Sequence, residues 1–115
     1  MIVNRDIDRL ELIVELIGHI GRRLATVTKD GFLRDQDEID LTAFRLLHIG
    51  ETSHKLSADL KARHPAIPWA AIYQMRNLIS HDYPAITPVR IWDTAATKLD
   101  ELRAMCRAEL DNLPE

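Results

Sequence analysis

The sequence is poor in cysteine, glycine, proline and aromatic residues, and each shortage narrows what the chain can be. Cys106 is the only cysteine, so the chain cannot form an internal disulfide or a zinc site built on several cysteines. We expect Cys106 to pack in the interior, because it lies in a periodic helical stretch. Glycine accounts for 4 residues, proline for 5 and aromatic residues for 5% of the chain. With so few helix breakers, helices are favoured over a sheet sandwich.

Long apolar runs and an excess of positive charge are also missing. No stretch approaches the roughly 20 apolar residues that span a bilayer, and residues 1–6 (MIVNRD) become charged before a signal-peptide core could form. We therefore expect a cytoplasmic protein that does not enter a membrane. The formal net charge is −3, whereas a protein that coats nucleic acid would be basic. Any contact with RNA is expected to be local and catalytic.

The length and the apolar periodicity predict a single all-α domain over residues 1–115. Apolar residues recur at spacings of three and four, which is the pattern of an amphipathic helix. We expect long helices over about residues 6–27, 37–63, 69–81 and 88–110. Because short connections join these helices, an up-and-down four-helix bundle is the expected architecture.

Several local features refine this expectation. Gly18 and Gly21 in the first helix would let a neighbouring helix approach closely, and Phe32 would pin the connection that follows. Pro84 biases Tyr83 away from helical geometry, so we expect the third helix to stop before it and Tyr83 to be extended and accessible.

The sequence gives little support for a metal centre or a protein nucleophile as the source of chemistry. Glu51 and His54 form a Glu-x-x-His step, the ligand pair of di-iron bundles, but a second such pair and two further inward glutamates are not apparent. Neither Ser80 nor Cys106 stands in a signature that would activate it as a nucleophile, and a glycine-rich phosphate loop is absent. The sequence therefore predicts no metal and no cofactor.

The end of the third helix offers a different chemistry, because Arg76, His81 and Tyr83 follow one another with the spacing Arg-x4-His-x-Tyr. Arginine can hold a phosphate through two parallel hydrogen bonds, and histidine can move protons at neutral pH. On an ideal helix, residues five apart point about 140° away from each other. Convergence then requires the helix to fray near His81, or two copies of the chain to face each other. On spacing alone, a surface ion pair of Arg76 and a helix cap by His81 are the favoured explanation of these residues.

Three segments in order resemble a known family: residues 47–51 (LHIGE), 65–69 (PAIPW) and 75–83 (MRNLISHDY). Together with Trp92 they resemble the HepT-like ribonucleases of the HEPN superfamily, and the last segment contains that family's Arg-x4-His-x-Tyr motif. The resemblance covers nearly the whole chain. It implies a HEPN-like helical bundle that dimerises and brings two copies of the motif together, and an endoribonuclease that works without a metal.

The resemblance also implies roles for individual residues. Arg76 and His81 would be the catalytic pair, acting on the phosphate charge and on proton transfer while the RNA 2′-hydroxyl serves as nucleophile. Asn77 would support this geometry, and Glu51 would orient a motif side chain from the second helix. Tyr83 would be the target of a partner, a MntA-like nucleotidyltransferase that attaches AMP to it.

The chain would accordingly be the toxin of a type VII-like toxin–antitoxin system, as a homodimer or in a larger hetero-oligomer with its antitoxin. Two other functions stay open at this point. One is a non-catalytic helical subunit that regulates a minimal nucleotidyltransferase, and the other is a small structural or dimerisation module.

Overall fold

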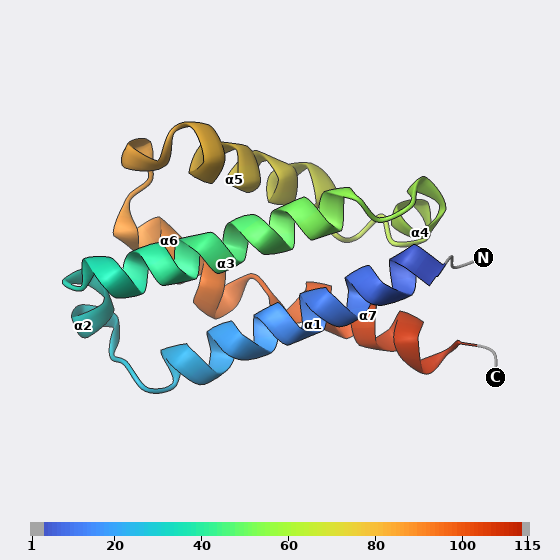
Figure 1. The fold of residues 1–115 in the computed structure, drawn as a ribbon, viewed down its shortest axis with the longest axis horizontal. Coiled ribbons are helices and arrows are strands. Elements are labelled where there is room, and N and C mark those ends of the chain that lie inside the picture. The colour runs from blue at the N-terminus through green and yellow to red at the C-terminus, as the bar shows by residue number, and fades with distance from the viewer. Residues whose placement is uncertain (1–3, 114–115) are drawn as a thin grey trace.

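The computed structural model describes residues 4–113, and within them the chain is all-helical without a β-strand. Its elements are α1 (Asn4–Leu24), α2 (Lys29–Leu33), α3 (Gln36–His54), α4 (Ala58–Arg63), α5 (Trp69–His81), the 3₁₀ helix η1 (Tyr83–Ala85), α6 (Pro88–Thr97) and α7 (Asp100–Asp111). Figure 1 shows α1, α3, α5 and the α6–α7 pair running in alternating directions along the long axis. The predicted all-α helical bundle is confirmed. None of the described helices is long and apolar enough to cross a membrane.

The core lies between α1, α3 and the α6–α7 pair, and the apolar stripe of α1 supplies much of it. Leu10, Ile13, Ile17 and Ile20 of that stripe are buried, as the periodicity predicts. Phe32 on α2 is fully buried and packs against Trp92 of α6, with ring centroids 5.1 Å apart. The short turn after α1 is therefore pinned to the core, as expected.

The close approach between helices occurs at a different glycine from those expected. Gly21 faces open space, and a Cβ at Gly18 would meet only the flexible end of Arg22. A Cβ at Gly50 on α3, however, would lie 2.6 Å from the Cβ of Arg76 on α5. The expectation for Gly18 and Gly21 was wrong, because a Cβ at either position would meet no neighbouring helix within 4 Å, and the tight contact joins α3 to α5.

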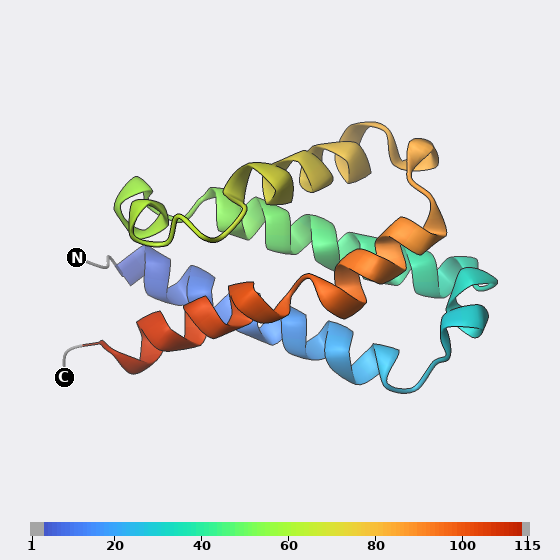
Figure 2. The same cartoon turned by 180° about the vertical axis from the view of Figure 1, so that it is seen from behind.

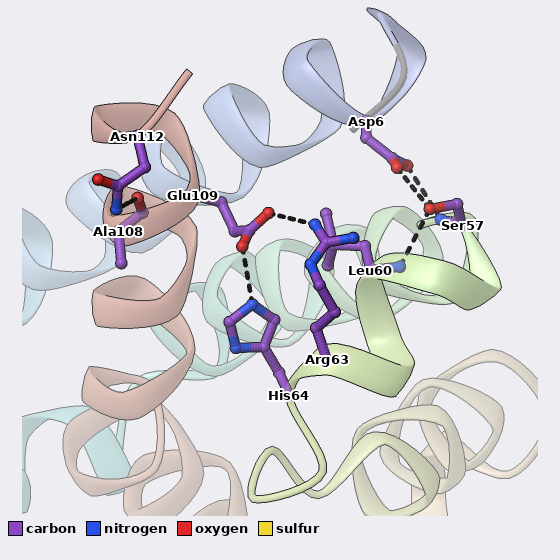
Figure 3. Close-up of polar contacts among 8 residues, drawn as sticks. All are labelled: Asp6, Ser57, Leu60, Arg63, His64, Ala108, Glu109 and Asn112. Atoms are coloured by element: carbon purple, nitrogen blue, oxygen red, sulfur yellow. Dashed lines mark hydrogen bonds and ion pairs between the residues drawn. The ribbon is translucent and has the colours of Figure 1, made fainter. Parts of the chain in front are cut away.

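The predicted second helix is divided in two, because α3 ends at His54 and α4 begins at Ala58. Ser57 caps α4 by accepting a hydrogen bond from the backbone N–H of Leu60. The carboxylate of Asp6 in α1 is fully buried and accepts hydrogen bonds from the backbone N–H and the hydroxyl of Ser57. This tertiary contact (Figure 3) compensates for the interrupted helix by fixing the start of α4 against α1.

The other end of α4 is fixed to α7. Glu109 accepts hydrogen bonds from Arg63 at 2.5 Å and from His64 at 3.0 Å, as Figure 3 shows. These partners hold the pKa of the Glu109 carboxyl below its usual value, although its desolvation acts in the opposite direction. The indole N–H of Trp69 donates to the backbone carbonyl of His64. The segment that leads into α5 is thus anchored on both sides.

The predicted last helix is also divided, between Thr97 and Asp100. Figure 2 shows the chain changing course between α6 and α7. As a result α6 packs against α2, α3 and α1, whereas α7 packs against α1. Leu99, at the break, is buried. An unbroken helix would run straight and could not make both sets of contacts.

The third predicted helix matches α5, which packs mainly along α3 through the buried side chains Met75 and Ile79. The chain then turns at Asp82 and forms η1. Tyr83 is therefore not extended, contrary to expectation. The fixed φ of Pro84 is also compatible with a 3₁₀ turn, and the hydroxyl of Tyr83 is tied back to α3.

Candidate active site

Arg76 lies on the face of α5 that meets α3, and Glu51 holds its guanidinium in place. Nε and Nη2 of Arg76 donate to the same oxygen of Glu51, at 2.8 and 2.5 Å. The Arg76 side chain is 22% exposed and that of Glu51 is 37% exposed, so the pair lies at the edge of the helix interface. Gly50, next to Glu51, leaves the space into which the stem of Arg76 fits.

Asn77 completes the fixation of the guanidinium. Its side-chain oxygen accepts a 2.9 Å hydrogen bond from Nη1 of Arg76. A guanidinium has five N–H donors, and the contacts to Glu51 and Asn77 use one each on Nε, Nη2 and Nη1. One N–H remains on each terminal nitrogen. Arg76 is therefore oriented and still able to offer two donors to an anion.

A hollow of about 660 Å³ lies against α5 and its C-terminal end. It is bordered by Tyr73, Gln74, Arg76, Asn77, Leu78, His81 and Asp82. His81 is exposed and belongs to the last turn of α5, so the helix does not fray before it. Arg76 and His81 border the same hollow, although no hydrogen bond joins them among the described residues. The structure thus brings Arg76, Asn77 and His81 to one surface and places Glu51 behind Arg76.

Tyr83 does not border this hollow. Its hydroxyl donates a 2.5 Å hydrogen bond to Oδ1 of Asp40, near the start of α3. Burial, followed by the hydrogen bond and the negative charge of Asp40, raises the pKa of Tyr83 well above its usual value. The same hydrogen bond, with one from Gln36, lowers the pKa of Asp40. The motif tyrosine is therefore neutral and turned towards α3.

Asp40 was not singled out from the sequence, and its contact with Tyr83 was missed. A signal was present, because Asp40 and Glu51 are eleven residues apart, which is about three helical turns. The two carboxylates therefore lie on the same face of α3, the one that faces the antiparallel helix α5. Each binds one member of the motif, Glu51 at Arg76 and Asp40 at Tyr83.

The Glu-x-x-His step has other partners in the structure. Glu51 binds Arg76, while the ring of His54 stacks on the ring of Tyr73, with centroids 4.0 Å apart and an interplanar angle of 20°. Tyr73 is 36% exposed and borders the hollow. Sequence reasoning did not single it out, although it lies one helical turn before Arg76 on α5.

Comparisons with known proteins identify the family of the chain. The model of the family described as ribonuclease HepT-like matches residues 11–109. A protein of Thermococcus cleftensis named "probable ribonuclease HepT" is 31% identical over 97 residues, which cover 84% of this chain and 87% of that protein. A protein of Caldanaerobacter subterraneus whose name describes it as a candidate RNase is 26% identical over 93 residues, with 81% and 83% coverage. No solved structure matches the chain.

The match begins at Glu11 in α1 and ends at Glu109 in α7. It therefore includes all the residues that border the hollow, and the residues of the contacts between Glu51 and Arg76 and between Asp40 and Tyr83. The chain belongs to the HepT-like ribonuclease family.

Proposed function

We propose that the chain is a metal-independent endoribonuclease in which Arg76 and His81 act on one phosphodiester bond. The observation that carries this proposal is that Arg76, fixed by Glu51 and Asn77, borders the same hollow as His81. The two remaining N–H donors of Arg76 would bind the non-bridging oxygens of the scissile phosphate. Because Glu51 offsets part of its charge, Arg76 would act mainly through directed hydrogen bonds, which strengthen as charge develops in the transition state.

The reaction follows from the chemistry of RNA. The 2′-hydroxyl attacks the adjacent phosphorus, the bond from phosphorus to the 5′-oxygen breaks, and a 2′,3′-cyclic phosphate and a 5′-hydroxyl end are formed. The proton lost by the nucleophile and the proton gained by the leaving oxygen balance each other. His81 would transfer these protons, a role that contributes about 10²- to 10⁴-fold to the rate of an enzyme.

A dimer would complete the site. The hollow is open to solvent on α5, and α5 packs within the chain mainly against α3. A second copy facing this side would bring a second His81 to the same substrate, so that one imidazole could accept a proton while the other donates one. Sedimentation of the purified chain would test this arrangement, and a monomer that cleaves RNA at full rate would contradict it.

We further propose that the chain is the toxin of a toxin–antitoxin pair and that a partner nucleotidyltransferase silences it at Tyr83. The tyrosine oxygen would attack the α-phosphorus of ATP, form a Tyr–AMP ester and release pyrophosphate. The bulky anion would be attached two residues from His81, beside the end of α5 that borders the hollow, where it would compete with RNA. The contact of Tyr83 with Asp40 would have to open, because the esterified oxygen has no proton to donate.

The catalytic proposal is tested by incubating the purified chain with varied RNAs in excess chelator. We expect cleavage to ends that carry a cyclic phosphate, and a loss of about 100-fold or more for His81→Ala. His19→Ala is the matched control, because His19 lies on α1 outside the hollow and contacts Glu15 and Arg22. Wild-type protein that leaves all RNAs intact would instead indicate a non-catalytic partner of the nucleotidyltransferase.

The switch is tested by intact-mass spectrometry of the chain co-expressed with a MntA-like nucleotidyltransferase. We expect added mass in whole AMP units on the wild type and none on Tyr83→Phe, together with loss of RNA cleavage by the modified chain. Tyr73→Phe removes the other tyrosine and should still be modified. Unmodified wild-type chain under confirmed co-expression would exclude the proposed modification.

A further inference from the structure

Tyr73 is an aromatic residue at the border of the hollow, and neither the motif nor the comparisons assign it a role. It precedes Arg76 by three residues on α5, so the two side chains lie on the same side of the helix. Both border the hollow, as does Asn77 in the next position. A ligand held by Arg76 would therefore have an aromatic ring beside it.

The ring of Tyr73 is held in place before any ligand arrives. The ring of His54, at the end of α3, stacks against it at 4.0 Å with a 20° tilt. Despite this partner, Tyr73 keeps 36% of its surface exposed and is among the few large apolar side chains that the described structure leaves in solvent. A ring that is supported on one face and partly exposed to solvent forms a rigid platform, and little side-chain entropy is lost when a flat group stacks on it.

The charge of the site explains why such a platform would be needed. Among the described residues that border the hollow, Arg76 is the only arginine or lysine, and it is already paired with Glu51, while Asp82 adds a negative charge. The chain as a whole has a formal charge of −3. Phosphate contacts alone would therefore supply little affinity for RNA. Stacking of a base on an aromatic ring is the other common source of affinity for single-stranded nucleic acid.

We propose that Tyr73, supported by His54, is a base-stacking residue that binds an unpaired nucleobase next to the phosphate held by Arg76. This inference rests on the proposed ribonuclease function and specifies its substrate as single-stranded RNA, because a base in a duplex has no free face to offer the ring. It also predicts weak dependence of binding on salt, since few phosphates are neutralised.

The test uses binding rather than cleavage, so that the stacking role is measured separately from catalysis. The probe is a fluorescently labelled single strand of about 8 nucleotides of 2′-O-methyl RNA, which lacks the nucleophile and cannot be cut. Its affinity is measured by anisotropy for the wild type and for Tyr73→Leu, Tyr73→Phe and Phe44→Leu. Phe44 is the matched control, because it is exposed, it pairs with His48 on α3 and it does not border the hollow.

We expect Tyr73→Leu to raise the Kd about 5- to 150-fold, which corresponds to about 1–3 kcal/mol for one base–aromatic stack. Tyr73→Phe and Phe44→Leu should leave the Kd within about twofold of the wild type, because the ring is kept in the first and the hollow is untouched in the second. An abasic residue introduced along the probe should weaken binding to the wild type but not to Tyr73→Leu. The same sequence in a duplex should bind weakly to every variant.

The inference is overturned if Tyr73→Leu binds the probe as the wild type does, or if Tyr73→Phe loses as much affinity as Tyr73→Leu. It is also overturned if Tyr73→Leu changes the sedimentation coefficient at unchanged helical content, since Tyr73 would then serve an interface between protein chains. If the wild type neither binds nor cleaves single-stranded RNA, the ribonuclease proposal itself fails. Normal cleavage with unchanged binding by Tyr73→Leu would reject the stacking role alone.

Discussion

The hydroxyl of Tyr83 donates a hydrogen bond of 2.5 Å to the carboxylate of Asp40, and this contact connects the end of the motif to the start of α3. Glu51, three turns further along the same face of α3, binds Arg76. The single helix α3 thus contacts both Arg76, which is proposed to bind the phosphate, and Tyr83, which is proposed to be modified, at two separate points. Each contact leads to a measurable expectation.

The first prediction concerns the ionisation of Tyr83. Burial is the largest cause of its raised pKa, and Asp40 adds to it through a hydrogen bond and its charge. Asp40→Ala in a Tyr73→Phe background, where Tyr83 is the only tyrosine, should therefore lower the pKa of Tyr83 while leaving it above the usual value of 10.0. An absorbance titration of tyrosinate measures this shift, and identical pKa values with and without Asp40 would contradict it.

The same contact has a consequence for stability at high pH. A tyrosine whose pKa is raised by folding stabilises the native state fully below its unfolded pKa of about 10, and this contribution is lost as the pH rises further. In the Tyr73→Phe background, denaturation midpoints should therefore fall as the pH rises above about 10, and the fall should continue to a higher pH when Asp40 is present than in Asp40→Ala. Equal pH dependence of the two proteins would show that Asp40 does not contribute.

The second prediction separates positioning from charge at Glu51. Glu51→Gln keeps an oxygen that can accept from Arg76, whereas Glu51→Ala leaves Nε and Nη2 without their partner. We expect RNA cleavage by Glu51→Ala to fall about tenfold or more in kcat/KM, as is usual when the residue that orients a functional group is lost. Glu51→Gln should retain most of the activity. If Glu51→Gln loses as much kcat/KM as Glu51→Ala, the carboxylate charge matters rather than the orientation of Arg76.

The third prediction compares the same substitution, glycine to alanine, at two helical positions that differ in the space around them. In Gly50→Ala the new Cβ would lie 2.6 Å from the Cβ of Arg76, which is part of the stem and cannot swing away. Overpacking costs about 1–3 kcal/mol, against about 1 kcal/mol gained from helix propensity, so stability should fall and Arg76 should shift. Gly21→Ala meets nothing within 4 Å and should gain about 0.5–1 kcal/mol. Urea denaturation of both variants checks the opposite signs, and a stabilised Gly50→Ala would show that α5 can move away freely.

The fourth prediction concerns Cys106, which is fully buried in α7. Burial raises the pKa of its thiol to about 12, and only the thiolate reacts readily. The folded chain should therefore react very slowly with a disulfide reagent at about pH 8, and quickly once denaturant is added. Cys106→Ser provides the blank. Fast reaction of the folded chain would mean that α7 opens from α1 under native conditions.

The sequence was sufficient for the features that depend on local periodicity. The stripe of Leu10, Ile13, Ile17 and Ile20 indicates which side of α1 is buried, because burial follows the helical repeat. The bounds of α5 follow equally well from Trp69 after Pro68 and from the stop before Pro84. The resemblance to the HepT-like ribonucleases also rests on ordered sequence segments, and the match over residues 11–109 confirms it.

The helix breaks could not be predicted in the same way. Nothing local interrupts the chain at Ser57, whose cap on α4 is reinforced by Asp6, 51 residues earlier. No glycine or proline marks the break before Asp100 in the sequence. The break is explained only by the different helices against which α6 and α7 pack. Both breaks serve tertiary contacts that a helical repeat does not encode.

By itself, then, the sequence determined the helical class, the buried stripes, the family and the residues of the Arg-x4-His-x-Tyr motif, because all of these are written in residue type and spacing. Only the tertiary structure decided what each motif residue contacts. The antiparallel packing of α3 on α5, which Gly50 permits, puts Glu51 behind Arg76, Asp40 against Tyr83 and His54 under Tyr73. These partners are distant along the chain, and their pairing depends on how two helix faces meet in space.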